Sequence, residues 1–217
     1  VFSKKRGFLS ETLSESEALG FAEAFVQTSN KKVSLADIGG YKFALSQVVR
    51  ASDFSTCFIP TACISLSSYN LGDDSVLYPL RDTCGCSFHW CADIAFLGAI
   101  KEYLERQFLV RFWLTKTCRS RISSKQVVQL LVRRDVLHLY NALSMSGEIT
   151  FLDISDTRFP GFCILVVYGQ EKDGRHVKYC AGMAYSSDMS IALEKSLLEL
   201  WQTFRFMNVF RATGSEE

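Results

Sequence analysis

The spacing of apolar residues along the chain predicts four helices. Residues 14–28 open with serines and acids typical of a helix start, and apolar side chains then recur every three or four positions. Residues 92–114 and 189–210 keep this spacing over longer stretches. Residues 123–144 repeat it, so we predict one long helix there with its valines and leucines turned towards a core.

Short apolar runs rich in β-branched residues predict the strands. They are residues 56–67, with Pro60 at an irregularity, 149–153, 162–168 and 176–185, the last two joined as a hairpin by a polar turn at 170–175. Strands mixed with long helices predict a mixed α/β (α+β) fold, in which helices pack on a β-sheet. No linker rich in proline, glycine or serine divides the chain, so we predict a single domain over residues 1–217.

The composition is that of a globular protein, and it excludes some classes of function. The 217 residues are 48% apolar and 22% charged, and the net charge is only +1, so no global field favours nucleic acid or membrane as a partner. No apolar run reaches the roughly 18 residues of a membrane helix, and no signal peptide opens the chain. We therefore expect a cytoplasmic protein. Its first residue is Val1 rather than methionine, which suggests a processed product or a fragment.

Seven of the eight cysteines fall into two kinds. Several lie in or beside apolar runs, as buried free thiols do in a reducing compartment. Cys84, Cys86, His89 and Cys91 form a tighter cluster with the spacing Cys-x-Cys-x-x-His-x-Cys. A zinc site is one interpretation of this cluster. A turn with incidental thiols is the other, and we favour it because the paired Cys-x-x-Cys spacing of common zinc sites is absent from the sequence.

The entries to two of the predicted helices resemble each other. Gly85 precedes Glu102 by 17 residues, and Gly182 precedes Glu199 by the same interval. The further matches are Glu105 with Gln202 and, at the helix starts, Asp93 with Ser190. This self-similarity predicts a duplicated unit made of a strand, a glycine-containing turn, a capped start and a helix.

The repeat gives the carboxylates a chemical meaning. Glu102, Glu105 and Arg106 share one helix face, and so do Glu199 and Gln202. If the related helices pack together, their carboxylates converge on one cleft and repel one another unless a cation lies among them. Mg²⁺ is the natural candidate, because it prefers oxygen ligands and shares them with nucleotide phosphates. The alternative is a solvated helix face carrying an ordinary i, i+4 ion pair between Glu102 and Arg106.

These motifs resemble those of the YcaO family. The stretch from Tyr78 to Gln107 contains RDTCGCSFH and EYLERQ and is similar to family members that mature microcin-like bacteriocins. Residues 21–27 (FAEAFVQ) and 196–202 (SLLELWQ) carry the likeness to both ends of the chain. The resemblance implies repeated strand-helix units with ATP and Mg²⁺ held by carboxylates from several helices.

It also implies an ATP-dependent cyclodehydratase. Such an enzyme phosphorylates the backbone amide oxygen of a ribosomal precursor peptide, so that Ser, Thr or Cys becomes an oxazoline or thiazoline. Thioamide or amidine formation at the same kind of site stays open. The implied partners are the precursor peptide, an E1-like leader-binding subunit and a dehydrogenase that carries FMN.

Residue by residue, the resemblance implies that Glu102, Glu105 and Glu199 bind Mg²⁺. Arg106, Gln202 and Ser87 would contact the nucleotide, and no catalytic residue is assigned. Family members also carry an earlier Glu-x-x-Glu-Arg helix, which nothing in residues 1–80 matches, and they extend beyond residue 217. The resemblance therefore implies a fragment that lacks the N-terminal carboxylate helix and the C-terminal part. An incomplete chain that serves only as an interaction module is the alternative function.

Overall fold

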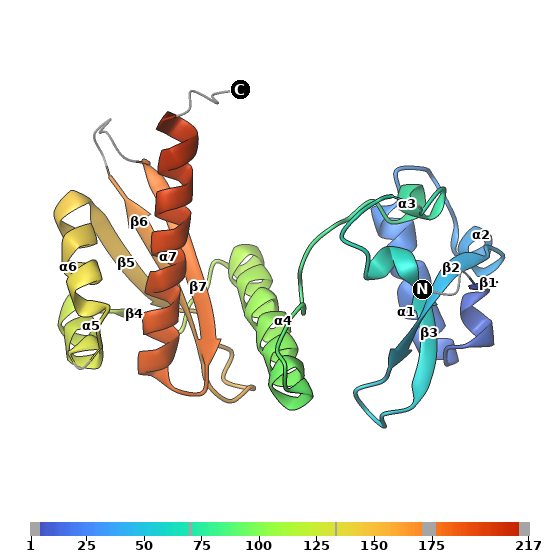
Figure 1. Ribbon diagram of the computed structural model, residues 1–217, viewed down its shortest axis with the longest axis horizontal. Helices are drawn as coiled ribbons and strands as arrows, with labels where there is room; N and C mark the ends of the chain where they lie inside the picture. Colours follow the sequence, from blue (N-terminus) through green and yellow to red (C-terminus); the bar gives the residue numbers. More distant parts are fainter. Residues whose placement is uncertain (1–4, 70, 133, 171–176, 213–217) are drawn as a thin grey trace. The chain divides into compact units, whose positions relative to one another are not determined.

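The computed structural model describes residues 5–69, 71–132, 134–170 and 177–212 (Figure 1). Contacts divide the chain into two compact units, residues 1–83 and 84–217. Two such units can be lobes of one domain, so the single domain over 1–217 stays a prediction. In the described ranges, none of the helices has both the length and the apolar character needed to cross a membrane. The mixed α/β fold class is confirmed.

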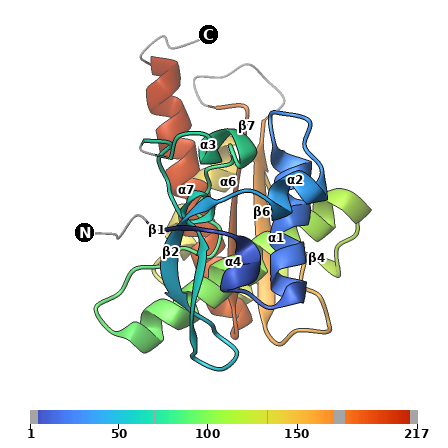
Figure 2. The same ribbon diagram turned by 90° about the vertical axis from the view of Figure 1, so that its right-hand side faces the viewer.

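The first unit is a small antiparallel sheet with helices. Its strands are β1 (Lys5–Gly7), β2 (Phe43–Val49) and β3 (Thr56–Pro60) in the order β1-β2-β3, and its helices are α1 (Glu15–Thr28), α2 (Leu35–Gly39) and α3 (Asp74–Leu77). Figure 2 labels α1, α2 and β2 from a second side. The helix α1 begins where Ser14 and Glu17 cap each other, as the serines and acids predicted. Its Phe25 stacks on Phe43 of β2 with ring centroids 4.7 Å apart and forms the centre of this core.

A buried carboxylate ties the ends of this unit together. Asp74 is fully buried and accepts hydrogen bonds from Arg6 Nη2 at 2.9 Å, from Tyr41 Oη at 2.8 Å and from the backbone N–H of Ala44 at 2.8 Å. A buried charge is tolerated only when such partners satisfy it. Asp74 thereby fixes β1 and β2 against α3.

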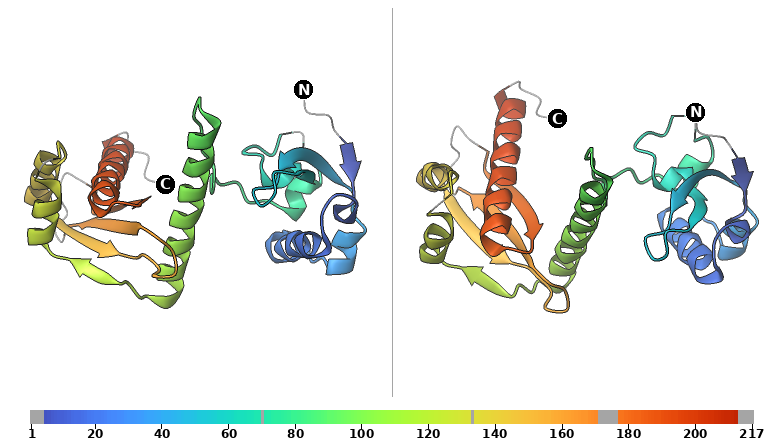
Figure 3. Two further views of the ribbon diagram at one scale, coloured as in Figure 1. Left: turned by 90° about the horizontal axis from the view of Figure 1, so that it is seen from below. Right: turned by 60° about the horizontal axis from the view of Figure 1, so that its bottom comes forward.

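The second unit has a four-stranded antiparallel sheet in the simple order β4-β5-β6-β7. Its strands are β4 (Ser120–Ile122), β5 (Glu148–Asp153), β6 (Phe162–Gly169) and β7 (Tyr179–Ser186). Its helices are α4 (Ala92–Thr115), α5 (Ser124–Leu131), α6 (Leu137–Ser146) and α7 (Met189–Ala212). Figure 3 shows α5, α6 and α7 on one side of this sheet.

Alternation along β6 explains how both faces of the sheet are used. Ile164 and Val166 point into the main core with side chains of α5, α6 and α7, whereas Cys163 and Leu165 point to the opposite face, where Phe108 of α4 packs. A run of apolar residues without polar alternation is what a strand covered on both faces requires. β7 is an edge strand of this sheet, as β4 is at the other side, and both α4 and α7 contact β7.

The structure corrects several boundaries. The prediction of one helix over 123–144 is wrong, because the helical segment is interrupted between α5 and α6. At the break, Arg134 turns to α7 and donates hydrogen bonds to Glu194 at 2.6 Å and to Ser190 at 2.9 Å. The strand predicted over 56–67 ends at Pro60. Most of the turn predicted at 170–175 lies outside the described residues.

Candidate functional site

Five of the six residues that the sequence singled out for Mg²⁺ or nucleotide line one hollow of the second unit. From α4 come Glu102 and Glu105, from α7 come Glu199 and Gln202, and Ser87 comes from the segment that precedes α4. The hollow has a volume of about 410 Å³. Spacings of three residues on each helix turn these side chains to the same side. The convergence expected from the sequence is therefore present, with β7 between the two helices.

The free edge of β7 positions two of the carboxylates. Glu105 Oε2 accepts a hydrogen bond from the backbone N–H of Tyr185 at 2.8 Å. Glu199 Oε2 accepts one from the N–H of Met183 at 3.3 Å. An edge strand leaves every second N–H without a partner in the sheet. The two glutamates satisfy these donors from α4 and α7, which fixes where their remaining oxygens point.

The carboxylates are held in an unfavourable electrostatic setting. Burial, together with repulsion from Glu199 and Glu102, raises the pKa of Glu105 to about 7 despite its hydrogen bond from Tyr185. Burial and repulsion from Glu102 also raise the pKa of Glu199. Glu105 is only 9% exposed to solvent. A cation would relieve this repulsion, and carboxylates with raised pKa values are typical of functional sites.

Arg106 lies beside the hollow rather than in its lining. Its Nε donates to Glu102 Oε1 at 3.0 Å, the i, i+4 ion pair that the sequence allowed. It faces an adjoining groove of about 660 Å³, which shares Glu105 and Glu199 with the hollow. Arg106 therefore stands where the two spaces meet.

Two lysines in the lining were missed by sequence reasoning. Lys101 of α4 and Lys195 of α7 both face the hollow. Lys195 precedes Glu199 by four residues, and its charge partly offsets the burial of that carboxylate. That i, i+4 spacing was the available signal. The hollow therefore carries both negative and positive side chains, which suits it to a metal ion together with an anion.

Small residues shape the approach to α4. A Cβ atom on Gly98 would lie 2.2 Å from Ser87 Oγ, so glycine at this position lets the segment before α4 lie against the helix. Gly85 adopts a φ of +72°, which favours glycine. These two glycines place Ser87 at the rim of the hollow.

The structure corrects the predicted repeat. Gly182 lies within β7 rather than in a turn, and the described residues just before α4 form a loop where the second copy has a strand. The start of α7 is capped by Asp188, whose carboxylate accepts from the N–H groups of Ser190 and Ile191, so neither Asp93 nor Ser190 is the capping residue. The likeness is thus confined to the helices and their glutamates.

In the described ranges, no set of three or more His, Cys, Asp or Glu side chains is arranged to hold a metal ion. His89 Nδ1 instead accepts the backbone N–H of Cys91 at 2.9 Å, a local turn contact, and all eight cysteines are free thiols. The zinc interpretation is therefore not supported. Mg²⁺ takes only one or two protein carboxylates and completes its shell with water and phosphate, so pairs among the three glutamates fit it.

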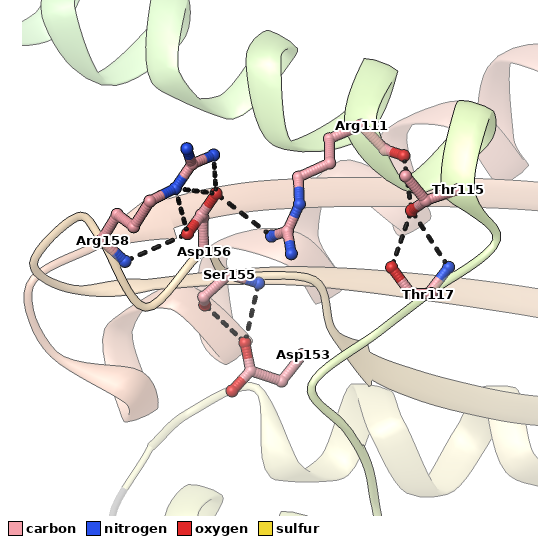
Figure 4. Close-up of polar contacts among 7 residues, drawn as sticks. All are labelled: Arg111, Thr115, Thr117, Asp153, Ser155, Asp156 and Arg158. Atoms are coloured by element: carbon pink, nitrogen blue, oxygen red, sulfur yellow. Dashed lines mark hydrogen bonds and ion pairs between the residues drawn. The ribbon is translucent and has the colours of Figure 1, made fainter.

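A polar network holds α4 against the sheet (Figure 4). Asp156, in the loop between β5 and β6, accepts from Arg158 Nη2 at 2.7 Å and pairs with Arg111 of α4 at 3.4 Å. These arginines, Arg158 first, lower the pKa of Asp156 to about 2. At the start of the same loop, the backbone N–H of Ser155 donates a hydrogen bond to Asp153 Oδ1. Sequence reasoning did not identify this network, which fixes the helix that carries Glu102 and Glu105.

The raised pKa of Glu105 predicts a pH-dependent stability effect. Its ionisation in the folded chain opposes folding, so the stability present below about pH 4.5 is lost as pH rises towards 7. We expect Glu105→Gln, which keeps an acceptor for Tyr185, to raise the free energy of unfolding at pH 8 by about 1–2 kcal/mol, a value reduced for solvent screening. Near pH 4 the variant and the wild type should be equally stable. Urea denaturation followed by tryptophan fluorescence measures this; an equal effect at both pH values would contradict it.

Comparison with known proteins places this geometry in a family. A family model described as YcaO cyclodehydratase, ATP- and Mg²⁺-binding, matches residues 39–214. Microcin B17-processing protein McbD of Escherichia coli is 32% identical over 206 residues, which is 95% of this chain and 51% of McbD. The chain thus spans about half the length of the curated relative that it matches.

Solved structures agree. A chain of the E. coli microcin synthetase McbBCD complex with pro-MccB17 bound superposes with a TM-score of 0.86 at 31% identity, covering 100% of this chain and 54% of that one. YcaO from Methanopyrus kandleri, bound with AMPPCP and Mg²⁺, superposes with a TM-score of 0.57 at 17% identity over 79% of this chain and 42% of that one, a likeness of fold alone. The resemblance carried by RDTCGCSFH and EYLERQ is confirmed, and the chain belongs to the YcaO family.

Proposed function

We propose that this chain is part of an ATP-dependent cyclodehydratase that activates backbone amides of a ribosomal precursor peptide during microcin-like bacteriocin maturation. The observation that carries the proposal is the convergence of Glu102, Glu105 and Glu199 on one hollow, where burial and mutual repulsion call for a cation. Membership of a family described as ATP- and Mg²⁺-binding supports the identity of the ligands.

The residues fit a magnesium-nucleotide complex. Pairs of oxygens from Glu102, Glu105 and Glu199 would hold Mg²⁺, and the bound ion would neutralise charge on the phosphates. Arg106, Gln202 and Ser87 would contact the nucleotide, joined by the lysines of the hollow. The chain's own contribution is to position phosphate groups and to hold donors near the charge that develops on them.

The proposed cyclodehydration needs no oxidant. The side chain of Ser, Thr or Cys gives up its hydroxyl or thiol proton and attacks the carbon of the preceding backbone carbonyl, and the former carbonyl oxygen takes the γ-phosphoryl group of ATP, which releases ADP. Phosphate then departs with that oxygen, and the amide nitrogen loses its proton as the C=N bond forms. The peptide loses one water per ring, and ATP yields ADP and phosphate. Phosphorylation matters because an unactivated amide oxygen is a poor leaving group.

The assembly follows from the same relative. The similar chain belongs to a complex named McbBCD, with pro-MccB17 bound. For this protein we propose the precursor peptide, an E1-like leader-binding subunit and an FMN-dependent dehydrogenase as partners, with FMN held by the dehydrogenase. Neither nucleic acid nor membrane is part of the proposal. A cytoplasmic setting fits the eight free thiols, which persist in reducing compartments.

The test uses the complete enzyme with its partner subunits and precursor peptide. We expect phosphate release to match the loss of water from the peptide, one for one, when ATP and Mg²⁺ are present. Mass spectrometry of the peptide and a phosphate assay on the same sample measure the two quantities. Water loss without ATP, or phosphate release that never modifies the peptide, would contradict the proposal.

A further inference from the structure

A groove runs along the free edge of β7 and opens into the carboxylate hollow. Its floor is the segment from Tyr179 to Met183 together with Leu152, Leu165 and Val167 on the α4 side of the sheet, and its volume is about 660 Å³. The helix α7 forms one wall with Glu199 and Thr203. The other wall is α4, whose apolar side chains Leu109, Phe112 and Trp113 follow Glu105 and Arg106 along the helix.

The floor presents backbone groups that point away from the sheet. Met183 and Tyr185 direct their N–H groups to Glu199 and Glu105, so these N–H groups do not bond to β6, although the two residues lie opposite Leu165 and Cys163 of that strand. In an antiparallel sheet such residues alternate with paired ones. Tyr179 and Ala181 therefore also turn their N–H and C=O groups outward. In the part of the chain that the structure describes, no side chain donates to or accepts from the backbone of these two residues.

The two ends of the edge thus differ. Towards Tyr185 the outward N–H groups are taken by carboxylates, and towards Tyr179 they are free to pair. The part from Tyr179 up to Met183 is about 13 Å long at the usual rise of a strand. Beside it the groove is walled by apolar side chains, among them Trp113, which is 60% exposed, and Tyr179 itself is 64% exposed. A strand with unpaired groups in an apolar groove is suited to an extended peptide, which binds by adding a strand.

We propose that an extended segment of the peptide substrate adds to the edge of β7 at Tyr179–Met183 and is delivered there to the carboxylate hollow. The inference rests on the proposed function and names where its substrate lies. Because Glu199 occupies the N–H of Met183, pairing stops at this point. The next backbone amide of the peptide then lies beside Glu105 and Glu199. Main-chain pairing also fixes the amide in register without selecting side chains.

An amide-to-ester scan of the precursor peptide tests this with the complete enzyme and its partner subunits. Each ester removes one backbone N–H and leaves the side chain unchanged. We expect the KM for the peptide to rise about fivefold for esters at alternate positions on one side of the modified residue, and to change little at the positions between. Esters tolerated equally at all positions, or sensitivity without a period of two, would overturn the inference.

A variant of the groove wall gives a second readout. Thr203→Trp fills the groove, and we expect the KM for the peptide to rise at least about tenfold. Val209→Trp is the control. Val209 lies further along α7 and does not line the groove, so this variant should leave the KM for the peptide unchanged. If another segment of the parent protein covers the edge of β7, Thr203→Trp will lower the unfolding temperature without raising the KM, and the inference fails.

The outcomes separate the inference from the function on which it rests. An unmodified peptide that loses no water in the presence of ATP and Mg²⁺ would refute the proposed function. A peptide that is cyclised normally but shows no alternating ester effect would refute only the strand addition.

Discussion

Gly182→Ala is expected to destabilise the second unit by about 3 kcal/mol or more, a large part of the stability of a typical domain. A Cβ atom at this position would lie 2.2 Å from the backbone N of Leu200 and 2.3 Å from the backbone O of Ser196. Both atoms belong to the main chain of α7, so no side chain can rotate away. Helix α7 cannot shift easily either, because Leu197 and Leu200 are fully buried in the main core. Urea denaturation followed by tryptophan fluorescence measures the loss.

A glycine without such neighbours provides the control. Gly20 lies in α1, and a Cβ atom added there meets nothing within 4 Å. Gly20→Ala should therefore stabilise the first unit by about 0.5–1 kcal/mol, because alanine favours the helix. Circular dichroism during thermal unfolding follows this unit. A Gly182→Ala variant as stable as the wild type would show that β7 and α7 are not packed as described.

The second large effect is expected on ligand binding. Glu199→Gln should weaken Mg²⁺-dependent ATP binding about 30-fold, because the change removes a charge from the hollow and replaces a good Mg²⁺ ligand with a poor one. The glutamine oxygen can still accept from Met183 N–H, so the fold should persist. Glu194→Gln is the matched control on the same helix, since Glu194 pairs with Arg134 and does not line the hollow. Calorimetric titration of both variants measures the difference, and equal loss in the two would contradict a local role for Glu199.

Much of the fold could be predicted because the signals were local. Periodic apolar residues and the Ser14 cap located α1, and the long apolar periodicity located α4 and α7. The strands β1, β2 and β4 were missed. Three residues in β1 and in β4 are too few for an alternating pattern, and the alternation along β2 is weak. The break between α5 and α6 depends on Arg134 reaching α7, a contact 56–60 residues away that no local pattern shows.

The site divides in the same way. The glutamates followed from helix spacing and from the resemblance, both of which are properties of the sequence. The hydrogen bonds of these glutamates could not be predicted from the sequence, because the edge position of β7 decides which N–H groups bond to Glu105 and Glu199. The equal spacing of Gly85 and Gly182 wrongly predicted a turn at both positions. Gly85 adopts a left-handed backbone conformation, whereas Gly182 lies in a strand and leaves room for the backbone of α7. Equal spacing in a sequence does not distinguish these two needs.

Proton release on binding tests the magnesium-nucleotide site most directly. Burial and neighbouring carboxylates raise the pKa of Glu105 to about 7, so at neutral pH a bound Mg²⁺ should expel its proton. We predict that calorimetric titration of the chain with Mg²⁺ and ATP near pH 7, in two buffers of different ionisation enthalpy, shows net proton release that Glu105→Gln abolishes. Binding that is independent of Mg²⁺, releases no proton and is unchanged in the Glu105 and Glu199 variants would contradict the account. A wild-type chain that binds no nucleotide would instead favour the interaction module.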